Sequence, residues 1–297
     1  MSDVDVDAND PFVFKYRGVY FQTEYTTPQK IDSIQDFKVK DTDVFLVTYP
    51  KTGTIWTQQI LSLIFNEGHR NGTEAIANVF RVPWIEYTHS KVDYDSRPSP
   101  RLFSSHLPHY LVPKDLRNKK GKIIYVGRNP KDAAVSYYHF YNVIVRLKQV
   151  NDWESFLDRY LTGEVLGGSW FDHVKGWYTH QEDFNILFVT YEEMKKDLRS
   201  AVLKICKFVE KELNEQEVDT IVEKATFKNM KHDPLANYTN VSTDHLDMKN
   251  GTFLRRGTVG DWKKLMTVAQ NEKFDKIYSE KMKGVPINFT WDINDGN

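Results

Sequence analysis

The sequence predicts a single α/β domain in which a central parallel sheet is flanked by helices. Short β-branched apolar runs alternate with helical stretches, Pro and Gly are scattered without forming a linker, and no internal repeat occurs. A chain of 297 residues is long enough to bury one large core. In such a fold, ligands bind at the carboxyl ends of the strands.

The first strand and helix surround a short loop. Residues 43–49 (DVFLVTY) form an apolar run that is typical of a buried parallel strand, and Pro50 ends it. After the loop at 51–54, residues 55–68 carry apolar side chains at helical spacing, and Gly68 marks the expected end of that helix. The chain therefore predicts a strand–loop–helix unit here.

Two further strand–helix pairs follow along the chain. Residues 122–126 (KIIYV) predict a second buried strand, and 132–147 predict the helix after it. Residues 185–190 (NILFVT) predict a third strand, which is followed by one long helix over 191–210. A last helix is expected at 214–225, because an Asn-x-x-Glu capping box stands at its start.

Composition excludes several function classes. The chain has 40 Lys and Arg against 41 Asp and Glu, so no global basic field recruits nucleic acid. No apolar run reaches the roughly 18 residues of a membrane helix, and acidic residues 1–10 predict a solvated tail before a domain over 11–297. The lone Cys206 excludes an intramolecular disulfide and a multi-cysteine zinc site. We expect a cytoplasmic protein without nucleic-acid or membrane partners.

The loop after the first strand carries the strongest chemical signal. A strand enters and a helix leaves, so free backbone N–H groups and the positive end of the helix face any bound anion. Lys51 adds a point charge, Gly53 permits close approach of the backbone, and Thr52 and Thr54 offer hydroxyls. The usual P-loop pattern GxxxxGK(S/T) is absent. Spacing alone leaves phosphate binding and an ordinary strand–helix turn equally open.

The same loop resembles a known family signature. The run TYPKTGTIW at 48–56 is similar to the TYPKSGTxW signature of the cytosolic sulfotransferases, and YVGRNPKDAAVSYYHFY and FLRRGTVGDWK resemble later motifs of that family. The similarity extends from about Phe12 to Trp291, and RVPWIEY and WFDHVKGWY resemble the amine sulfotransferase branch. It implies that a P-loop-like loop holds the phosphosulfate of the co-substrate 3′-phosphoadenosine 5′-phosphosulfate. The sulfuryl group would pass to an amine or hydroxyl of a small, largely apolar arylamine, phenol or steroid, leaving adenosine 3′,5′-bisphosphate.

The resemblance also implies which residues bind the donor. Arg128 follows a strand directly, where ligand contacts fall, although each Arg taken alone would be read as a surface charge. Trp56 and Phe227 are expected to stack on adenine, where ordinary core packing is the alternative, and Ala225 replaces a Thr of many relatives. The implied donor-binding residues are Lys51, Thr52, Gly53, Thr54, Ile55, Trp56, Arg128, Ser136, Tyr191, Thr226, Phe227, Met230, Arg255, Arg256 and Gly257.

A histidine suits the proton removal that sulfuryl transfer requires, because its pKa lies near neutrality. Of nine His, His106 stands in Ser-Ser-His-Leu-Pro, where relatives read Lys-Thr-His-Leu-Pro. The resemblance implies that His106 is the general base and that Lys51 stabilises charge on the bridging oxygen. Since Ser104 replaces a cation, Lys51 is expected to carry more of that stabilisation. His106 and His109 lack a neighbouring acidic ligand, so no metal is expected.

Aromatic residues are abundant, with 7 Trp, 16 Tyr and 18 Phe, and they suit an apolar acceptor pocket, although core packing is the alternative for any single ring. The polar stretch 238–250 predicts a lid. Matches to the family's KxxxTVxxxE motif imply a homodimer through Lys263, Thr267, Val268 and Glu272. The resemblance implies acceptor contacts by Phe21, Trp84, His106, Tyr138, His139, Phe140 and Tyr238.

Two other function classes stay open from the residues alone. A P-loop-type small-molecule kinase or NTPase needs Mg²⁺ and usually an acidic ligand at a strand end, whereas the third predicted strand ends in Thr190 and Tyr191. A non-catalytic nucleotide-binding module would keep the loop at 51–54 but would leave His106 without a role.

Overall fold

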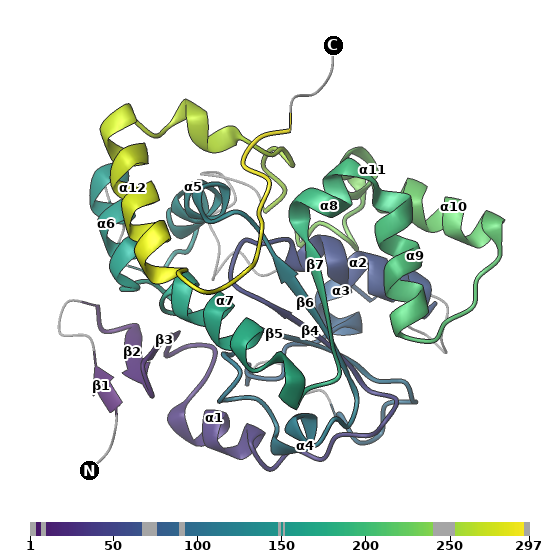
Figure 1. Cartoon of the computed structure of the whole chain (residues 1–297). Helices are drawn as coiled ribbons and strands as arrows, with labels where there is room; N and C mark the ends of the chain where they lie inside the picture. The colour runs from purple at the N-terminus through teal and green to yellow at the C-terminus, as the bar shows by residue number, and fades with distance from the viewer. Residues whose placement is uncertain are drawn as a thin grey trace.

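The structure is a computed structural model that describes residues 4–6, 10–66, 76–88, 93–147, 150, 152–239 and 253–293. At its centre lies a four-stranded parallel sheet with the strand order β5-β4-β6-β7 (Figure 1). The strands are β4 (Val44–Thr48), β5 (Leu102–Ser105), β6 (Lys122–Gly127) and β7 (Ile186–Thr190).

Three of these strands confirm the sequence prediction, whereas β5 was missed. Its sequence, LFSS, has no continuous apolar run, because its last two residues are serines. Pairing with β4 nevertheless places all four of its side chains in the buried interior. The strand therefore depends on a partner distant in sequence, which local patterns do not reveal.

Both faces of the sheet are buried, which explains why the other strands read as continuous apolar runs. Alternate side chains face opposite layers: Phe45 and Ile123 join one core cluster, while Leu46 and Ile124 join the other. The first layer holds α5 (Pro130–Tyr141), α6 (Trp153–Thr162), α7 (Trp170–Thr179) and α12 (Val268–Lys281). The second holds α2 (Thr54–Ile64), α8 (Tyr191–Lys196), α9 (Leu198–Phe208) and α10 (Glu215–Lys224) (Figure 1).

Smaller elements surround these layers. A separate antiparallel sheet has the order β1-β2-β3 and consists of β1 (Val4–Val6), β2 (Val13–Tyr16) and β3 (Val19–Gln22). Its first strand lies within the segment expected to be a solvated tail. The short helices are α1 (Pro28–Ile34), α3 (Asn78–Arg81), α4 (Lys114–Arg117), η2 (Gln181–Asp183), α11 (Phe227–His232) and η3 (Asp261–Lys264).

The predicted long helix over 191–210 was wrong, because the chain breaks it into α8 and α9 at Asp197. The backbone of Asp197 is extended, with φ −149°, and its carboxylate accepts the N–H of Ser200 as an N-cap. The helix expected over 132–147 ends at Tyr141, well before its predicted end. The helix expected over 55–68 ends at Ile64, and its marker Gly68 lies outside the described residues.

The helix predicted at 214–225 is confirmed as α10, including its capping box. Asn214 accepts the N–H of Glu217, and the Glu217 carboxylate accepts the N–H of Asn214 in return. These two reciprocal bonds satisfy donors that the first turn of a helix leaves free. No helix in the described ranges is long and apolar enough to cross a membrane.

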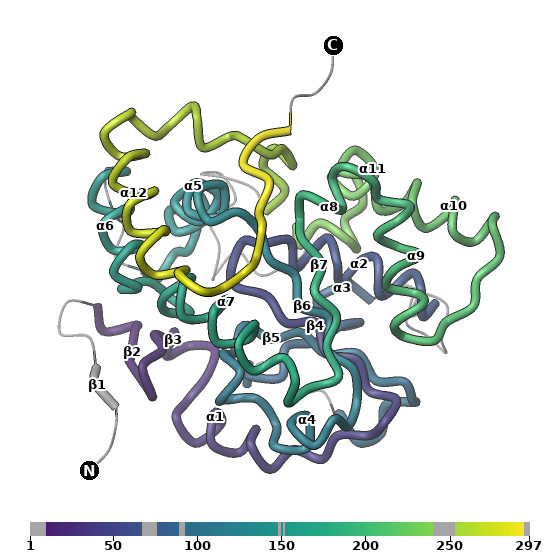
Figure 2. Tube along the Cα trace, in the orientation of Figure 1, coloured from purple at the N-terminus to yellow at the C-terminus, as the bar shows by residue number. Residues whose placement is uncertain are grey.

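After α12, the chain returns across the molecule to the carboxyl end of β6, as the yellow tube of Figure 2 shows. The Phe289 ring lies against Gly127, where an added Cβ would come within 3.2 Å of it. Asn129 donates to the carbonyl of Thr290 at 3.2 Å, and the Trp262 indole donates to the carbonyl of Trp291 at 2.9 Å. The last described residues therefore brace the loop that follows β6.

A buried ion pair fixes the opposite end of the sheet. Arg101 donates to both carboxylate oxygens of Asp43, at 2.9 and 2.5 Å, and neither side chain is exposed. The Asp43 carboxylate also accepts the N–H of Lys40 at 2.8 Å. Every charge in this pair is therefore compensated, and removing one partner leaves the other charge uncompensated in the interior.

We expect Asp43→Ala to lower the free energy of unfolding by about 3–5 kcal/mol, the typical cost of leaving a buried charge unpaired. Urea denaturation followed by circular dichroism measures the loss. Asp41→Ala removes the same charge from an exposed site two residues earlier and should cost less than about 0.5 kcal/mol. Equal losses in the two variants would contradict the role given to the pair.

Candidate functional site

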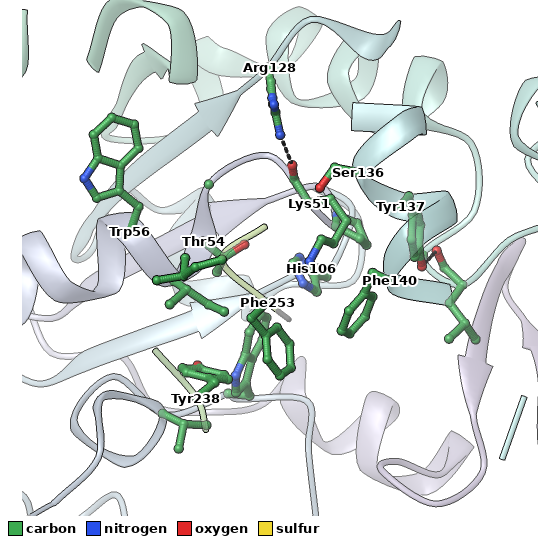
Figure 3. A pocket seen from close by; sticks show the side chains of 18 of the residues that line it. Lys51, Thr54, Trp56, His106, Arg128, Ser136, Tyr137, Phe140, Tyr238 and Phe253 are labelled. Atoms are coloured by element: carbon green, nitrogen blue, oxygen red, sulfur yellow. Dashed lines mark hydrogen bonds between the residues drawn. The ribbon is translucent and has the colours of Figure 1, made fainter. Parts of the chain in front are cut away.

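A cavity of about 640 Å³ lies at the carboxyl ends of the parallel strands. All four strands contribute to it: Lys51 follows β4, His106 follows β5, Arg128 follows β6 and Tyr191 follows β7. This is the edge of the sheet at which the sequence predicts a ligand site. In Figure 3, Lys51 and His106 lie centrally, with Trp56 and Arg128 towards one side and Tyr238, Phe253 and Phe140 towards the other.

The loop between β4 and α2 has the tight backbone that the sequence suggested. Lys51 and Gly53 both have positive φ values, 68° and 114°, and a Cβ on Gly53 would lie 3.1 Å from the Tyr191 ring. Only a glycine at position 53 accommodates both constraints without strain. The helix α2 begins directly after this glycine, so its first N–H groups and the positive end of its dipole face the cavity.

The two threonines of this loop point in different directions. The Thr52 hydroxyl is buried, donates to the carbonyl oxygens of Tyr49 and Val126 at 2.7 and 3.0 Å, and does not line the cavity. Thr54 does line it, and its hydroxyl lies 2.7 Å from the Thr48 hydroxyl. Thr52 therefore holds the loop to β6, while Thr54 is accessible to a ligand.

Lys51 places its ammonium nitrogen among aromatic rings. The nitrogen lies 4.0 Å from the centre of the Phe140 ring and 5.4 Å from that of Phe253. Burial, followed by the positive charges of Arg128 and Arg255, lowers the pKa of Lys51 to about 7. Near neutral pH the amine of Lys51 is therefore only partly protonated, and an anionic ligand in the cavity would favour its charged form.

Arg128 joins the loop after β6 to two other segments. It donates to the carbonyl oxygens of Lys51 at 3.2 Å and Thr258 at 3.0 Å, and its guanidinium lies 4.2 Å from the centre of the Tyr191 ring (Figure 3 shows the bond to Lys51). Its Nε is buried and makes no hydrogen bond within the described part of the chain. Ser136, on α5, lines the same cavity.

Two further arginines reach the cavity from the loop before η3. Arg255 and Arg256 both pair with the carboxylate of Asp261, at 2.5 and 2.7 Å. Gly257 has φ 66°, and a Cβ there would fall 2.3 Å from the Phe227 ring, so only glycine permits this close approach. The cavity thus gathers cations from three separate segments in a protein whose net charge is −1.

An aromatic side of the cavity lies beyond these cations. The Trp56 indole donates to the carbonyl of Ala225 at 2.7 Å and meets the Tyr191 ring edge-on at 5.2 Å between centroids. Ile55, Tyr191, Phe227 and Met230 also line the cavity. Thr226 does not line it: its hydroxyl caps α11 by accepting the N–H of Asn229. The alanine at 225, which stands where many relatives have Thr, offers no side-chain hydroxyl, but its carbonyl is a fixed partner of Trp56.

His106 directly follows β5, and its ring nitrogen Nδ1 lies 2.7 Å from the carbonyl oxygen of Thr48. A carbonyl only accepts, so Nδ1 carries the proton and Nε2 is left with its lone pair. The pKa of His106 is lowered to about 4, first by burial and then by the charge of Lys51, against the effect of the bond to Thr48. His106 is therefore a neutral imidazole whose Nε2 is an acceptor nitrogen.

The acceptor residues implied by the resemblance divide into two groups. Phe21, Trp84, Phe140 and Tyr238 line the cavity beside His106, and the Trp84 ring lies 4.4 Å from the His106 ring. Tyr138 and His139 do not line it. Tyr138 instead packs against the rings of Trp153 and Phe156, because it projects from another face of α5.

Ser104, the departure from the usual family lysine, is enclosed in the interior. Its hydroxyl accepts from the Gln58 amide at 2.8 Å and donates to the carbonyl of Val82 at 3.1 Å. The same Gln58 accepts the hydroxyl of Tyr238 at 2.6 Å, and Tyr238 has φ 64°. Ser104 thus supports a wall of the cavity through Gln58. The remainder of the predicted lid, residues 240–250, lies outside the described ranges.

Sequence reasoning missed several residues of the cavity. Glu86, Tyr137, Phe253 and Thr258 all line it. All four stand inside runs that resemble family motifs: Glu86 in RVPWIEY, Tyr137 in YVGRNPKDAAVSYYHFY, and Phe253 and Thr258 in FLRRGTVGDWK. The motif letters beside the assigned residues were therefore the available signal. Within the described ranges, no three His, Cys, Asp or Glu residues gather closely enough to hold a metal ion.

Comparisons with known proteins find sulfotransferases along nearly the whole chain. The sequence model of the family described as "Sulfotransferase domain" matches residues 41–286. The chain is 53% identical to an amine sulfotransferase of Oryctolagus cuniculus, over 98% of this chain and 97% of that protein. It is 43% identical to sulfotransferase 2B1 of Rattus norvegicus, over 94% and 82% respectively. A crystal structure of mouse sulfotransferase SULT7A1 complexed with PAP superimposes with a TM-score of 0.75 and 32% identity, covering 93% of this chain and 96% of that one.

We expect Lys51→Met to raise the pKa of His106, because the positive charge of Lys51 opposes protonation of the imidazole. The rise should be partial, since burial remains the larger cause. Titration of the His106 ring by nuclear magnetic resonance measures it, and His180, which does not line the cavity, serves as the internal reference. An unchanged or lower pKa would contradict the electrostatic coupling of the two residues.

Proposed function

The chain belongs to the sulfotransferase family, and we propose that its cavity binds 3′-phosphoadenosine 5′-phosphosulfate beside a small acceptor and transfers the sulfuryl group between them. The observation that carries this proposal is the meeting of the Lys51 loop, Arg128 and the Arg255–Gly257 segment with His106 in one cavity. The mouse relative bound to PAP, the product of such a donor, supports the identity of the nucleotide.

In this proposal the donor lies along the cationic part of the cavity. The 5′-phosphosulfate contacts Lys51, Gly53 and Thr54 and the positive end of α2, while Thr52 holds the loop in place from the interior. The second phosphate contacts Arg128, Ser136, Arg255, Arg256 and Gly257, and it must share the two arginines with Asp261. The adenine lies between Trp56 and Phe227, with Ile55, Tyr191 and Met230 nearby, while Thr226 acts through the cap of the helix that carries Phe227.

The proposed chemistry follows from the protonation of His106. Nε2 of the neutral imidazole takes the proton of the acceptor while the acceptor oxygen or nitrogen bonds to sulfur. The bond between sulfur and the bridging phosphate oxygen breaks, and Lys51 together with the N–H groups of α2 stabilises the charge left on that oxygen. The negative charge of the donor also raises the pKa of both His106 and Lys51. The neutral imidazole thereby becomes a stronger base for the acceptor proton, and Lys51 carries its positive charge when the leaving oxygen needs it.

The acceptor in this proposal is small and largely apolar. Phe21, Trp84, Phe140 and Tyr238 line the cavity beside His106, with His106 itself as the polar contact. The similarity to an amine sulfotransferase over nearly the whole chain supports an amine, while phenol and steroid hydroxyls use the same proton transfer. Tyr138 and His139 are assigned at most an indirect role, through the packing of α5.

A cytoplasmic location is part of the same proposal. The single cysteine, Cys206, is buried and free, and a protein without disulfides is typical of a reducing compartment. Fractionation of cells that express the full chain tests the location, and recovery of the protein with membranes or in the medium would contradict it.

We expect His106→Ala to lower kcat by about 10²–10⁴-fold, the usual contribution of a general base. The measurement is transfer of labelled sulfate to a panel of an arylamine, a phenol and a hydroxysteroid. Binding of adenosine 3′,5′-bisphosphate, followed by calorimetry, should stay within about threefold, because the base does not contact the nucleotide. The matched variant His109→Ala, which alters a histidine outside the cavity, should keep kcat within about threefold.

Two results would overturn the proposed roles. Full turnover in His106→Ala would remove the base from the mechanism. Binding of the donor by the wild-type chain without transfer to any acceptor of the panel would instead favour a nucleotide-binding module that performs no chemistry.

We also propose a homodimer through Lys263, Thr267, Val268 and Glu272. Thr267 caps α12, and the apolar side chain of Val268 directly after it is 76% exposed. Glu272 is exposed on the same helix. Two copies related by a two-fold axis would bury both valines and pair the lysine of one with the glutamate of the other.

We expect Val268→Glu to convert the dimer into a monomer, because two like charges would face each other at the two-fold axis. Sedimentation velocity measures the change. Val145→Glu alters another exposed valine, 51% accessible, and should leave the dimer intact. A wild-type chain that sediments as a monomer at micromolar concentration would contradict the interface.

A further inference from the structure

Two buried side chains hold the main chain of His106, and neither takes part in the chemistry proposed above. Glu86 accepts the backbone N–H of His106 at 2.7 Å, and the ring nitrogen Nε2 of His173 lies 3.2 Å from its carbonyl oxygen. Both side chains are almost completely buried, at 2% and 3% exposure. The peptide groups on either side of the His106 Cα are therefore fixed independently of its ring.

Glu86 reaches this position because residues 84–86 run beside β5. A parallel bridge joins Trp84 to Ser104, and the N–H of Ile85 donates to the carbonyl of Ser104 at 3.1 Å. Glu86 consequently lies next to the residue that follows the strand, which is His106. Its oxygen Oε1 accepts the amide of His106, whereas its other oxygen, Oε2, is buried without a hydrogen-bond partner among the described residues.

His173 belongs to α7, in the first layer of helices, and contacts the carbonyl group of His106. Burial, as the largest cause, lowers the pKa of His173 to about 3, so its ring is neutral. The carbonyl of His106 only accepts, which places the proton of His173 on Nε2. Nδ1 then accepts the Tyr125 hydroxyl at 3.0 Å, and this fixes the tautomer that donates to His106.

We propose that Glu86 and His173 are positioning residues that clamp the main chain of His106, so that its ring keeps Nδ1 on the Thr48 carbonyl and Nε2 free for the acceptor proton. The proposal rests on the role of His106 as base. A base must lie within hydrogen-bond reach of the proton it removes, and a displacement of about 1 Å can cost 10²-fold in rate. The carboxylate thus acts through the peptide amide and not through the imidazole.

The substitution Glu86→Gln distinguishes a role of the hydrogen bond to the His106 amide from a role of the negative charge of Glu86. Burial raises the pKa of Glu86 to about 7, so the neutral carboxyl group is well populated at neutral pH and still offers Oε1 to the amide of His106. A glutamine at this position keeps the same acceptor oxygen without any charge. An alanine removes the acceptor and leaves the N–H of His106 unpaired.

We expect Glu86→Ala to lower kcat by about 10–10²-fold with every acceptor of the panel, while the KM for the donor changes less than about threefold. Glu86→Gln should recover kcat to within about threefold of the wild type. A loss in Glu86→Gln as large as in Glu86→Ala would overturn the proposal, and so would a loss confined to the KM of the donor.

Glu192 provides a matched control. It is also buried at 2% exposure, its pKa is also raised to about 7, and its Oε1 accepts a backbone N–H, that of Asn129, at 2.8 Å. Its Oε2 is likewise buried without a hydrogen-bond partner in the described ranges. Glu192→Ala therefore creates the same kind of buried defect away from His106.

The ring nitrogens of His106, labelled with ¹⁵N, give a readout that does not depend on turnover. In the wild type, Nδ1 should carry the proton, and in Glu86→Ala the two tautomers should mix, whereas Glu192→Ala should leave the His106 signals in place. Equal changes in the two alanine variants would overturn the clamp. If His106→Ala retained turnover, the role of His106 as base would fail, while these signals would still test the clamp itself.

Tyr125→Phe provides a second route if Glu86→Ala does not fold. It removes only the hydroxyl that fixes the His173 tautomer, and it should lower kcat and mix the His106 tautomers in the same direction. Unchanged His106 signals in Tyr125→Phe would overturn the part assigned to His173.

Discussion

The pairing of β4 with β5 on one side and β6 on the other is the constraint on which the site depends. Its register sets Val47 opposite Ser105 and Thr48 opposite Val126, so the residues that follow the three strands emerge together. Thr48 is thereby close enough to fix the ring of His106, and the loop after it close enough for Arg128 to hold the Lys51 carbonyl. A slip of one residue in either ladder would separate these partners and would reverse the faces of the strand.

The cationic side chains of the cavity repel one another, and neighbouring aromatic rings and a carboxylate offset part of that repulsion. Lys51, Arg128, Arg255 and Arg256 all reach one cavity of a nearly neutral protein. Aromatic faces contact the first two, while Asp261 pairs with the other two. These contacts are weaker substitutes for an anion, and they keep the cations in place before a ligand arrives, so that little reorganisation is needed when it binds.

The sequence predicted those parts of the fold whose signal is local. Continuous apolar runs indicate buried strands such as β4 and β6, and the strand before it and the helix after it indicate the Lys51 loop. The strand β5 and the hydrogen bond from the His106 N–H to Glu86 both depend on pairing between segments far apart in the chain, which no local pattern indicates. The break between α8 and α9 was visible as an aspartate three residues before a serine, but the helical periodicity on both sides concealed it.

The two parts of the cavity are built from different kinds of structure. The cationic part lies at the ends of the central strands. The part beside His106 that is proposed to hold the acceptor includes Phe21 from the small antiparallel sheet, and Tyr238 and Phe253 from connecting segments. Substitutions in the peripheral segments leave the ladders of the central sheet intact. A lineage carrying this fold can therefore change the compounds it modifies through positions such as Phe21 and Tyr238, which lie outside the donor-binding segments, while its nucleotide chemistry stays constant.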